Sequence, residues 1–474
     1  MQTRTTLLFL ASFFLLPFCW SQSVVSIKAK MLDLVSQPAY FGYYMGEKQY
    51  VKDTIAIDDK GTISIEYTEL LDQGIYFLAF PEKEMTYFDF IVGPKQQFSF
   101  QGKLADFTKS AVFKGSEDNT LFYDYLKKIK QLKVKGDALS TLEKQCQKTG
   151  NKDSLKLIEK QQVQLDLDFN KFRDNYFVKY PNAFITKILG YQYRPIIPVT
   201  ITDPTEQYNY YKSHLFDHID WSFSPIVRTP AYASLLVEYI DKLTVQSPDS
   251  IMVSCDKILS KVSANKELFK FTLIDLVNKY ARSKIICFDA VYVHLVDEYY
   301  NKGLAFWLNP EVVNDKAQLD NIKYAAGRLK PVLCGCSTYN FSLADLNEKR
   351  VELKEVNAPY TLLLFWSREC GDCKNTIKEL NVQRELLEKK GVKVVAICMD
   401  IVTEDWKKTV EKYSFGWATN LTVSTEAENE EIAQLYNLYS APFMYLLDEN
   451  KRIKYKRFDS LQLKEIFNSL PDKQ

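Results

Sequence analysis

Residues 360–373 read YTLLLFWSRECGDC, and this stretch decides the fold of the C-terminal third of the chain. Its mostly apolar first half predicts a buried strand, and a helical pattern follows from about Cys373 to Lys390. Unpaired N–H groups and a partial positive charge at a helix N-terminus favour thiolate over thiol. Because the thiolate is the reactive form, Cys370 is the expected nucleophile of a Cys370-Gly371-Asp372-Cys373 disulfide centre.

Strands and helices alternate on both sides of this stretch, from about residue 331 to the end. The order βαβαβαββα predicts a central mixed sheet covered by helices. The expected elements are a strand over 361–366, a helix over 373–390 capped by Gly391, a strand over 392–399, a helix near 403–413, a strand near 420–424, a helix near 428–437, a hairpin of 443–447 with 452–455, and a helix over 461–470.

The preceding two thirds of the chain divides into a β-rich and a helical part. Residues 22–115 alternate in short segments such as 62–67 and predict a β-sandwich-like domain, with 58–61 as a hairpin-type turn. Residues 116–330 carry amphipathic patterns and predict an all-α domain. We therefore expect a multi-domain protein, with a signal peptide at 1–21, these two domains, and an α/β domain at 331–474.

The first 21 residues have the pattern of a secretory signal. Arg4 supplies the positive start, Leu7 to Phe18 is apolar, and cleavage is expected before Gln22. Phe18 stands where a lipoprotein needs a small residue before Cys19, which favours export without a lipid. No later segment is apolar over the roughly 20 residues that a membrane span requires. We expect a periplasmic or other cell-envelope location, with no transmembrane segment in the mature chain.

Charge limits the expected partners, and cysteine content limits the part that disulfides play in the fold. The chain has 61 basic and 60 acidic residues, and the signal removes one arginine, so nothing favours nucleic acid as a partner. Of nine cysteines, eight lie outside the signal, which is sparse for a chain of 474 residues. Disulfides are therefore not the scaffold, although an oxidising compartment lets some cysteines pair.

The order of elements with C-x-x-C after the first long strand resembles the thioredoxin fold. Phe365-Trp366 resembles the aromatic lead-in of that family, and Ala441-Pro442 falls where thioredoxins carry a cis-proline beside the cysteines. The pattern is most similar to the exported TlpA/ResA-like thioredoxins of Gram-negative envelopes, and it covers about the last 140 residues. The resemblance implies that Cys370 and Cys373 are catalytic and that Trp366, Ala441 and Pro442 bind the substrate.

Three positions depart from the family pattern. Glu369 replaces a tryptophan, Leu364 replaces a buried acid that accepts a proton, and Ala441 replaces a threonine. Glu369 and Asp372 add negative charge beside Cys370, which opposes the helix dipole and raises the expected pKa of its thiol.

The main hypothesis is an exported thiol–disulfide oxidoreductase that acts on protein disulfides or thiols, most consistent with a reductase. It implies a membrane or periplasmic electron donor, and no cofactor or metal. One alternative is a peroxidase of the thiol-specific antioxidant type, for which Ser367 fits the hydroxyl position but Leu363 replaces the proline. A second alternative is a non-catalytic envelope binding protein that uses a thioredoxin scaffold.

Other cysteines and histidines have weaker interpretations. Cys334 and Cys336 suit either a second redox pair or relay for Cys373, or an unpaired or locally bridged pair on an edge segment, and the latter is favoured. Cys398 is expected to be a buried, inert thiol. His214 and His218 stand four apart, but an ordinary role is favoured over a metal site. The scattered Cys146, Cys255 and Cys287 are interpreted as structural residues in helices.

Overall fold

The computed structural model of the chain describes residues 24–401 and 404–473, so the expected signal peptide lies outside the described residues. The chain forms two compact units that meet at Glu238 and Tyr239. We call them the N-terminal unit and the C-terminal unit. Their boundary falls inside the segment 116–330 that the sequence predicts as one helical domain, and the predicted domain limits stay a prediction.

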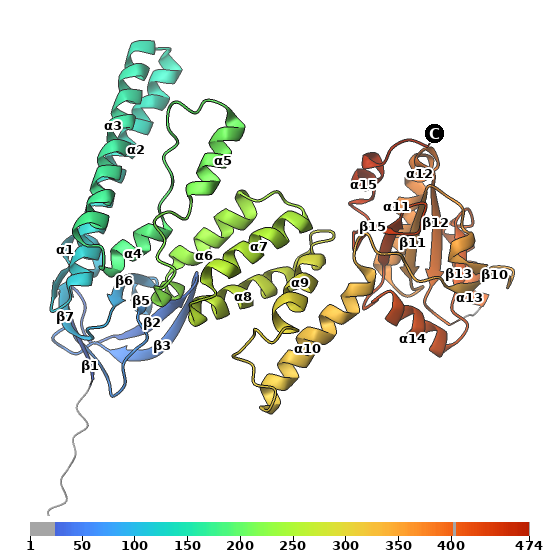
Figure 1. Cartoon of the computed structure of the whole chain (residues 1–474), viewed down its shortest axis with the longest axis horizontal. Coiled ribbons are helices and arrows are strands. Elements are labelled where there is room, and N and C mark those ends of the chain that lie inside the picture. Colours follow the sequence, from blue (N-terminus) through green and yellow to red (C-terminus); the bar gives the residue numbers. More distant parts are fainter. Residues whose placement is uncertain (1–23, 402–403, 474) are drawn as a thin grey trace, which may run out of the picture. The chain divides into compact units, whose positions relative to one another are not determined.

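The N-terminal unit begins with two four-stranded sheets that form a β-sandwich (Figure 1). One sheet has the order β4-β1-β7-β8 and the other β3-β2-β5-β6. Phenylalanines fill the space between the sheets, and the ring of Phe100 lies 5.8 Å from Phe88 and 5.4 Å from Phe90. The strands are β1 (Val25–Met31), β2 (Pro38–Met45), β3 (Lys48–Ala56), β4 (Thr62–Tyr67), β5 (Gly74–Phe80), β6 (Thr86–Val92), β7 (Gln97–Gly102) and β8 (Val112–Lys114).

The turn at 58–61 is present but does not make the expected hairpin. Asp58 accepts hydrogen bonds from the backbone of Lys60 and Thr62, which shapes the turn. The turn connects β3 to β4, and these strands lie in different sheets. The prediction was wrong here because the turn residues show where the chain reverses, but not which strand becomes the partner.

A long helical hairpin follows the sandwich. Asn119, in the first turn of α2, bonds through its side-chain amide to both the N–H and the C=O of Ile91, and this covers part of the outer edge of β6. The helices of this unit are α1 (Phe107–Ser110), α2 (Glu117–Thr149), α3 (Lys152–Lys179), α4 (Phe184–Tyr191), α5 (Pro204–His214) and α6 (Pro230–Val237).

The C-terminal unit contains four further α-helices that precede a seven-stranded mixed sheet. The sheet order is β10-β9-β13-β12-β11-β14-β15, with helices on both faces (Figure 1). The preceding helices are α7 (Pro248–Val262), α8 (Lys266–Ala281), α9 (Asp289–Leu295) and α10 (Val313–Leu329). The sheet and its helices comprise β9 (Ser342–Asp345), β10 (Arg350–Glu352), β11 (Tyr360–Trp366), α11 (Gly371–Val382), α12 (Arg384–Lys390), β12 (Val392–Cys398), α13 (Glu404–Lys412), β13 (Thr419–Thr422), α14 (Glu426–Leu435), β14 (Phe443–Leu447), β15 (Ile453–Lys456) and α15 (Leu463–Ser469).

The alternation of side chains along β11 explains the three layers. Leu362 and Leu364 belong to the core cluster that includes residues of α11, α12 and α15, whereas Leu363 and Phe365 belong to the cluster that includes residues of α14. β11 pairs with β12 in parallel and with β14 antiparallel, so it is central and buried on both faces. The α/β fold of the C-terminal domain is therefore as the sequence predicts.

Two local features differ from the expected elements. The helix expected over 373–390 is divided at Gln383 into α11 and α12. Gly391 ends α12 with a φ of 70°, as its role as C-cap predicts. The strands β9 and β10 are additions that the sequence analysis missed.

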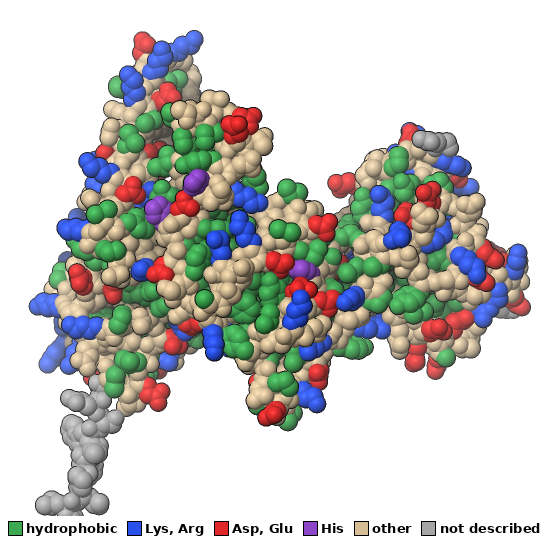
Figure 2. All heavy atoms as spheres, viewed as in Figure 1, with side chains coloured by type: hydrophobic (Ala, Val, Ile, Leu, Met, Phe, Trp, Pro, Cys, Tyr) green, Lys and Arg blue, Asp and Glu red, His purple; other side chains and the backbone are tan. Residues whose placement is uncertain are grey.

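Basic and acidic side chains are intermixed on the face that Figure 2 shows. Across residues 24–401 and 404–473, no helix combines the length and the apolar character that crossing a bilayer requires.

Candidate active site

The site lies where the central strand β11 ends and α11 begins. Residues 361–366 are buried, and the chain emerges at Ser367. Cys370 is the N-cap of α11, and the backbone N–H of Cys373 points at the Cys370 sulfur from 3.1 Å. The sulfur therefore lies in the partial positive potential of a helix N-terminus, which stabilises a thiolate.

The two cysteines differ in exposure, and they are joined by a disulfide. Cys370 is partly exposed, whereas Cys373 is fully buried. An attacking partner therefore reaches only the Cys370 sulfur, and Cys373 can act only on what is already bonded to Cys370. This asymmetry suits a nucleophile and a resolving cysteine.

The expected substrate contacts divide into two groups. Ala441 and Pro442 are partly exposed, their peptide bond is cis, and the Ala441 carbonyl oxygen lies 3.3 Å from the Cys370 sulfur. Trp366 differs from its expected role, because its side chain is fully buried in the core cluster on the α11 face. It packs in the core under the site, and it has no exposed surface that a substrate could contact.

The charged departures from the family pattern lie at the surface. Glu369 and Asp372 are both exposed beside Cys370. Leu364 is fully buried in the core, so the position of the usual proton acceptor is apolar. Solvent screens the two exposed acids, but both have the sign that opposes thiolate formation.

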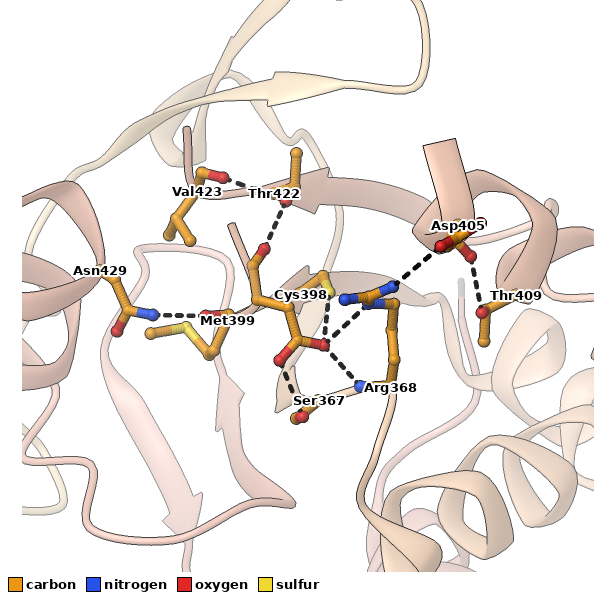
Figure 3. Close-up of polar contacts among 10 residues, drawn as sticks. Ser367, Arg368, Cys398, Met399, Asp405, Thr409, Thr422, Val423 and Asn429 are labelled. Carbon is orange, nitrogen blue, oxygen red and sulfur yellow. Dashed lines mark hydrogen bonds and ion pairs between the residues drawn. The ribbon is translucent and has the colours of Figure 1, made fainter. Parts of the chain in front are cut away.

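Asp400 is a site residue that the sequence analysis missed. Its carboxylate accepts hydrogen bonds from the Ser367 hydroxyl at 2.9 Å, the Arg368 backbone N–H at 2.7 Å and the Arg368 Nε at 3.2 Å (Figure 3). Asp400 thus fixes two of the three residues between β11 and Cys370. Its position after a buried strand places it at this edge of the sheet, where the ends of parallel neighbours meet, but does not show which residues it contacts.

The charge of Asp400 is stabilised in place. Burial alone raises its pKa, but the hydrogen bonds from Arg368 and Ser367 outweigh burial and hold the pKa below the ordinary value. Cys398 donates from its thiol to the same carboxylate at 3.6 Å. Burial, aided by the negative charge of Asp400, raises the pKa of the Cys398 thiol to about 12, so this cysteine is unreactive at neutral pH.

We expect Asp400→Asn to lower the free energy of unfolding of the C-terminal unit by about 1–3 kcal/mol, since hydrogen bonds to a charged group contribute that much. The folded-state pKa of Asp400 is depressed, so its contribution is present above the unfolded pKa of about 3.9 and is lost as pH falls through the folded pKa. Urea titrations at pH 7 and pH 3 measure both effects.

The matched control is Asp405→Asn. Asp405 is 67% exposed at the side chain and lies 3.9 Å from Arg368, so its removal is expected to cost less than about 0.5 kcal/mol. Equal losses in the two variants would contradict the role of Asp400.

A second disulfide joins Cys287 to Cys334. The favoured prediction, that Cys334 and Cys336 are unpaired or bridged to each other, was wrong for Cys334, because its partner comes from a segment 47 residues away. Cys336 is a free, partly buried thiol. Cys287 lies in the loop between α8 and α9, not inside a helix as expected.

The histidines have ordinary partners. The Nδ1 of His214 lies 2.6 Å from the Asp217 carboxylate, and the ring of His218 packs at a tilt against that of Tyr193, with centroids 4.0 Å apart. α5 ends at His214, so His214 and His218 do not share a helix face. Within the described part of the chain, no group of three or more metal-binding side chains gathers at one point.

Two family models match the chain. Residues 144–318 match a domain of unknown function, DUF5106, and residues 334–456 match the AhpC/TSA family. The second match includes the C-x-x-C, Asp400 and Pro442.

Curated relatives match the same C-terminal region. The thiol-disulfide oxidoreductase ResA of Bacillus thuringiensis is 25% identical over 114 residues, which are 24% of this chain and 63% of that protein. ResA of Bacillus subtilis is 26% identical over 121 residues, which are 25% of this chain and 65% of that protein. The chain therefore spans less than two thirds of the length of these relatives.

Solved structures from Bacteroides are also similar. A thioredoxin-like protein from Bacteroides caccae matches with a TM-score of 0.45 and 19% identity, over 58% of this chain and 97% of that one. A thiol:disulfide interchange protein from Bacteroides sp. matches with a TM-score of 0.27 and 20% identity, over 29% of this chain and 88% of that one.

Proposed function

We propose that this chain, whose C-terminal domain is a thioredoxin-like domain of the TlpA/ResA kind, is a thiol–disulfide oxidoreductase that acts on protein disulfides through Cys370 and Cys373. The observation that carries the proposal is the pairing of an accessible Cys370 at a helix N-terminus with a buried Cys373. A disulfide with only a structural role would not require one exposed sulfur next to a surface that can bind a peptide.

The proposed reaction has two exchanges. The Cys370 thiolate attacks one sulfur of a client disulfide, and the other client sulfur leaves as a thiolate. The Cys373 thiolate then attacks the Cys370 sulfur, which releases the second client thiolate and leaves Cys370–Cys373 oxidised. An electron donor, in the membrane or the periplasm, must reduce this disulfide before the next cycle.

Backbone groups next to Pro442 support binding of an extended client segment. Among the described residues, none accepts from the backbone N–H groups of Tyr439, Ser440 and Ala441. An extended peptide can pair with such free groups as an added strand does. This is the role proposed for Ala441 and Pro442.

Export and the direction of transfer are also part of the proposal. The signal pattern of residues 1–21 and the second disulfide both fit an oxidising compartment, since disulfides rarely persist in the cytosol. The acids Glu369 and Asp372 favour a reductase, because they oppose the thiolate form of Cys370.

The peroxidase alternative is less well supported. The Ser367 hydroxyl, which fits the hydroxyl position of such enzymes, donates to Asp400 and is not free to bind a peroxide. Consumption of peroxide by the reduced protein, followed in parallel with disulfide reduction, separates the two functions.

Trapping tests the proposed roles. Cys373→Ser should accumulate mixed disulfides with protein clients, because the second exchange is removed, whereas Cys370→Ser should trap none. Non-reducing gels and mass spectrometry after alkylation measure the adducts. Cys336→Ser, which removes a free and partly buried thiol, is the control and should behave as wild type does. Equal trapping by the Cys370 and Cys373 variants would refute the assignment.

A further inference from the structure

A cavity of about 530 Å³ lies beside Pro442, within the C-terminal unit. Ser440, Pro442 and Phe443 of the thioredoxin-like domain line part of it. The loop 283–287, which joins α8 to α9, lines another part. Two segments of the chain that are far apart in sequence therefore form one cavity next to the cysteines.

The loop 283–287 is held in place at three points. The disulfide Cys287–Cys334 bonds its last residue to the start of the thioredoxin-like domain. Two residues further, Asp289 forms a buried ion pair with Lys456 of β15. Ile286 packs against the core cluster on the α11 face. A wall fixed in this way loses little conformational freedom when a ligand binds.

The cavity is adjacent to the reactive sulfur. Ser440 and Pro442 line it, and Ala441 between them places its carbonyl oxygen 3.3 Å from the Cys370 sulfur. Ile286 and Cys370 pack against the same core cluster. A chain that lies along 439–442 with its cysteine at Cys370 therefore brings neighbouring side chains to this cavity.

The lining combines apolar surface with polar and positively charged side chains. Ile285 is 59% exposed and Tyr439 63% exposed, which leaves apolar surface for a side chain. Lys284 and Arg457 also line the cavity, and neither forms an ion pair with any described residue. The lining acid Asp459 already accepts hydrogen bonds from the backbone of Leu461 and Gln462.

We infer that the loop 283–287 is a specificity-determining wall of the client site, and that the cavity takes an extended client segment with an apolar and an acidic side chain next to its cysteine. The inference rests on the proposed oxidoreductase function. The helical segment before the thioredoxin-like domain would then contribute directly to client specificity through this loop.

A single-turnover reaction tests this choice without another reductant. Two peptides carry one cysteine bonded to 2-nitro-5-thiobenzoate, a leucine, and either a glutamate or a lysine next to the cysteine. The Cys370 thiolate attacks the peptide sulfur, and the coloured thiolate leaves. The Cys373 thiolate then attacks Cys370, the peptide thiolate leaves, and the two electrons come from the reduced enzyme. Alkylation and mass spectrometry verify that Cys287–Cys334 stays bonded.

Wild type should react with the glutamate peptide roughly fivefold faster than with the lysine peptide, as expected for exposed charge pairs. Lys284→Glu should bring this ratio to one or below, and Lys316→Glu, on α10 and outside the cavity lining, should leave it unchanged. The double variant Cys287→Ala/Cys334→Ala, which frees the loop, should reduce the ratio while circular dichroism verifies its fold.

A wild-type ratio of one, or an unchanged ratio in Lys284→Glu, would overturn the inference and leave the oxidoreductase function intact. Failure of the reduced enzyme to release the coloured thiolate from either peptide and from the free chromogenic disulfide would overturn the proposed function, and the inference with it.

Discussion

Asp289→Ala is expected to lower the free energy of unfolding of the C-terminal unit by about 3–5 kcal/mol, as removal of one partner from a buried ion pair does. The side chain of Lys456 is 1% exposed and that of Asp289 is 8% exposed. Lys456 also donates to the Val332 carbonyl at 2.6 Å. Without Asp289, the ammonium group keeps its burial but loses its counter-charge.

The pH dependence of the Asp289→Ala variant identifies the cause. Burial already lowers the pKa of Lys456, and the charge of Asp289 opposes this. Removing Asp289 depresses the folded-state pKa further, so the unfolded chain binds more protons than the folded one. The stability of the variant should therefore be lowest below the folded-state pKa of Lys456. It should rise with pH from there to about 10.4, the ordinary pKa of lysine. Denaturant titrations from pH 7 to pH 10 measure this slope.

Two controls accompany this variant. Asp289→Leu/Lys456→Met replaces both charges with apolar groups and should recover most of the loss. Glu298→Ala breaks the exposed pair with Lys302 in the same unit and should cost less than about 1 kcal/mol. A loss in Asp289→Ala no larger than that in Glu298→Ala would show that the buried pair is not important for stability.

The Cys370–Cys373 couple is expected to be reducing, near the roughly −270 mV of thioredoxin and far from the roughly −120 mV of DsbA. A strong oxidant needs a stabilised thiolate in its reduced form. Here Glu369 and Asp372 are exposed beside Cys370, and their charge opposes that thiolate. Equilibration with glutathione buffers, read by alkylation and mass, measures the potential.

The variant Glu369→Gln/Asp372→Asn tests the cause of this potential. It removes both charges without changing the size of the side chains, and the potential should become less negative. A wild-type potential near the oxidising end would show that the helix N-terminus outweighs the two acids, and the protein would then be a disulfide donor.

The elements around the cysteines could be predicted from the sequence because they are buried runs with clear ends. β11 and β12 are continuous apolar segments, and Gly391 marks the end of α12. β9 and β10 have four and three residues, too few to show a period, and they exist because β9 pairs with β13.

What the sequence could not supply is the pairing of distant residues. Cys287 and Cys334 are 47 residues apart, and connectivity among several cysteines cannot be deduced from the sequence. Asp400 reaches the site through the register that pairs Trp366 with Cys398, which places the residues after both strands side by side. The cavity beside Pro442 depends in the same way on a loop from another segment.

The bond between Cys287 and Cys334 also sets the smallest piece of the chain that is worth producing alone. A fragment that begins at residue 331 would leave Cys334 as an unpaired thiol and Lys456 without its carboxylate partner. A fragment that begins at Tyr239 retains both partners and coincides with the boundary between the compact units. Studies of the isolated redox domain should therefore carry the helices α7–α10 with it.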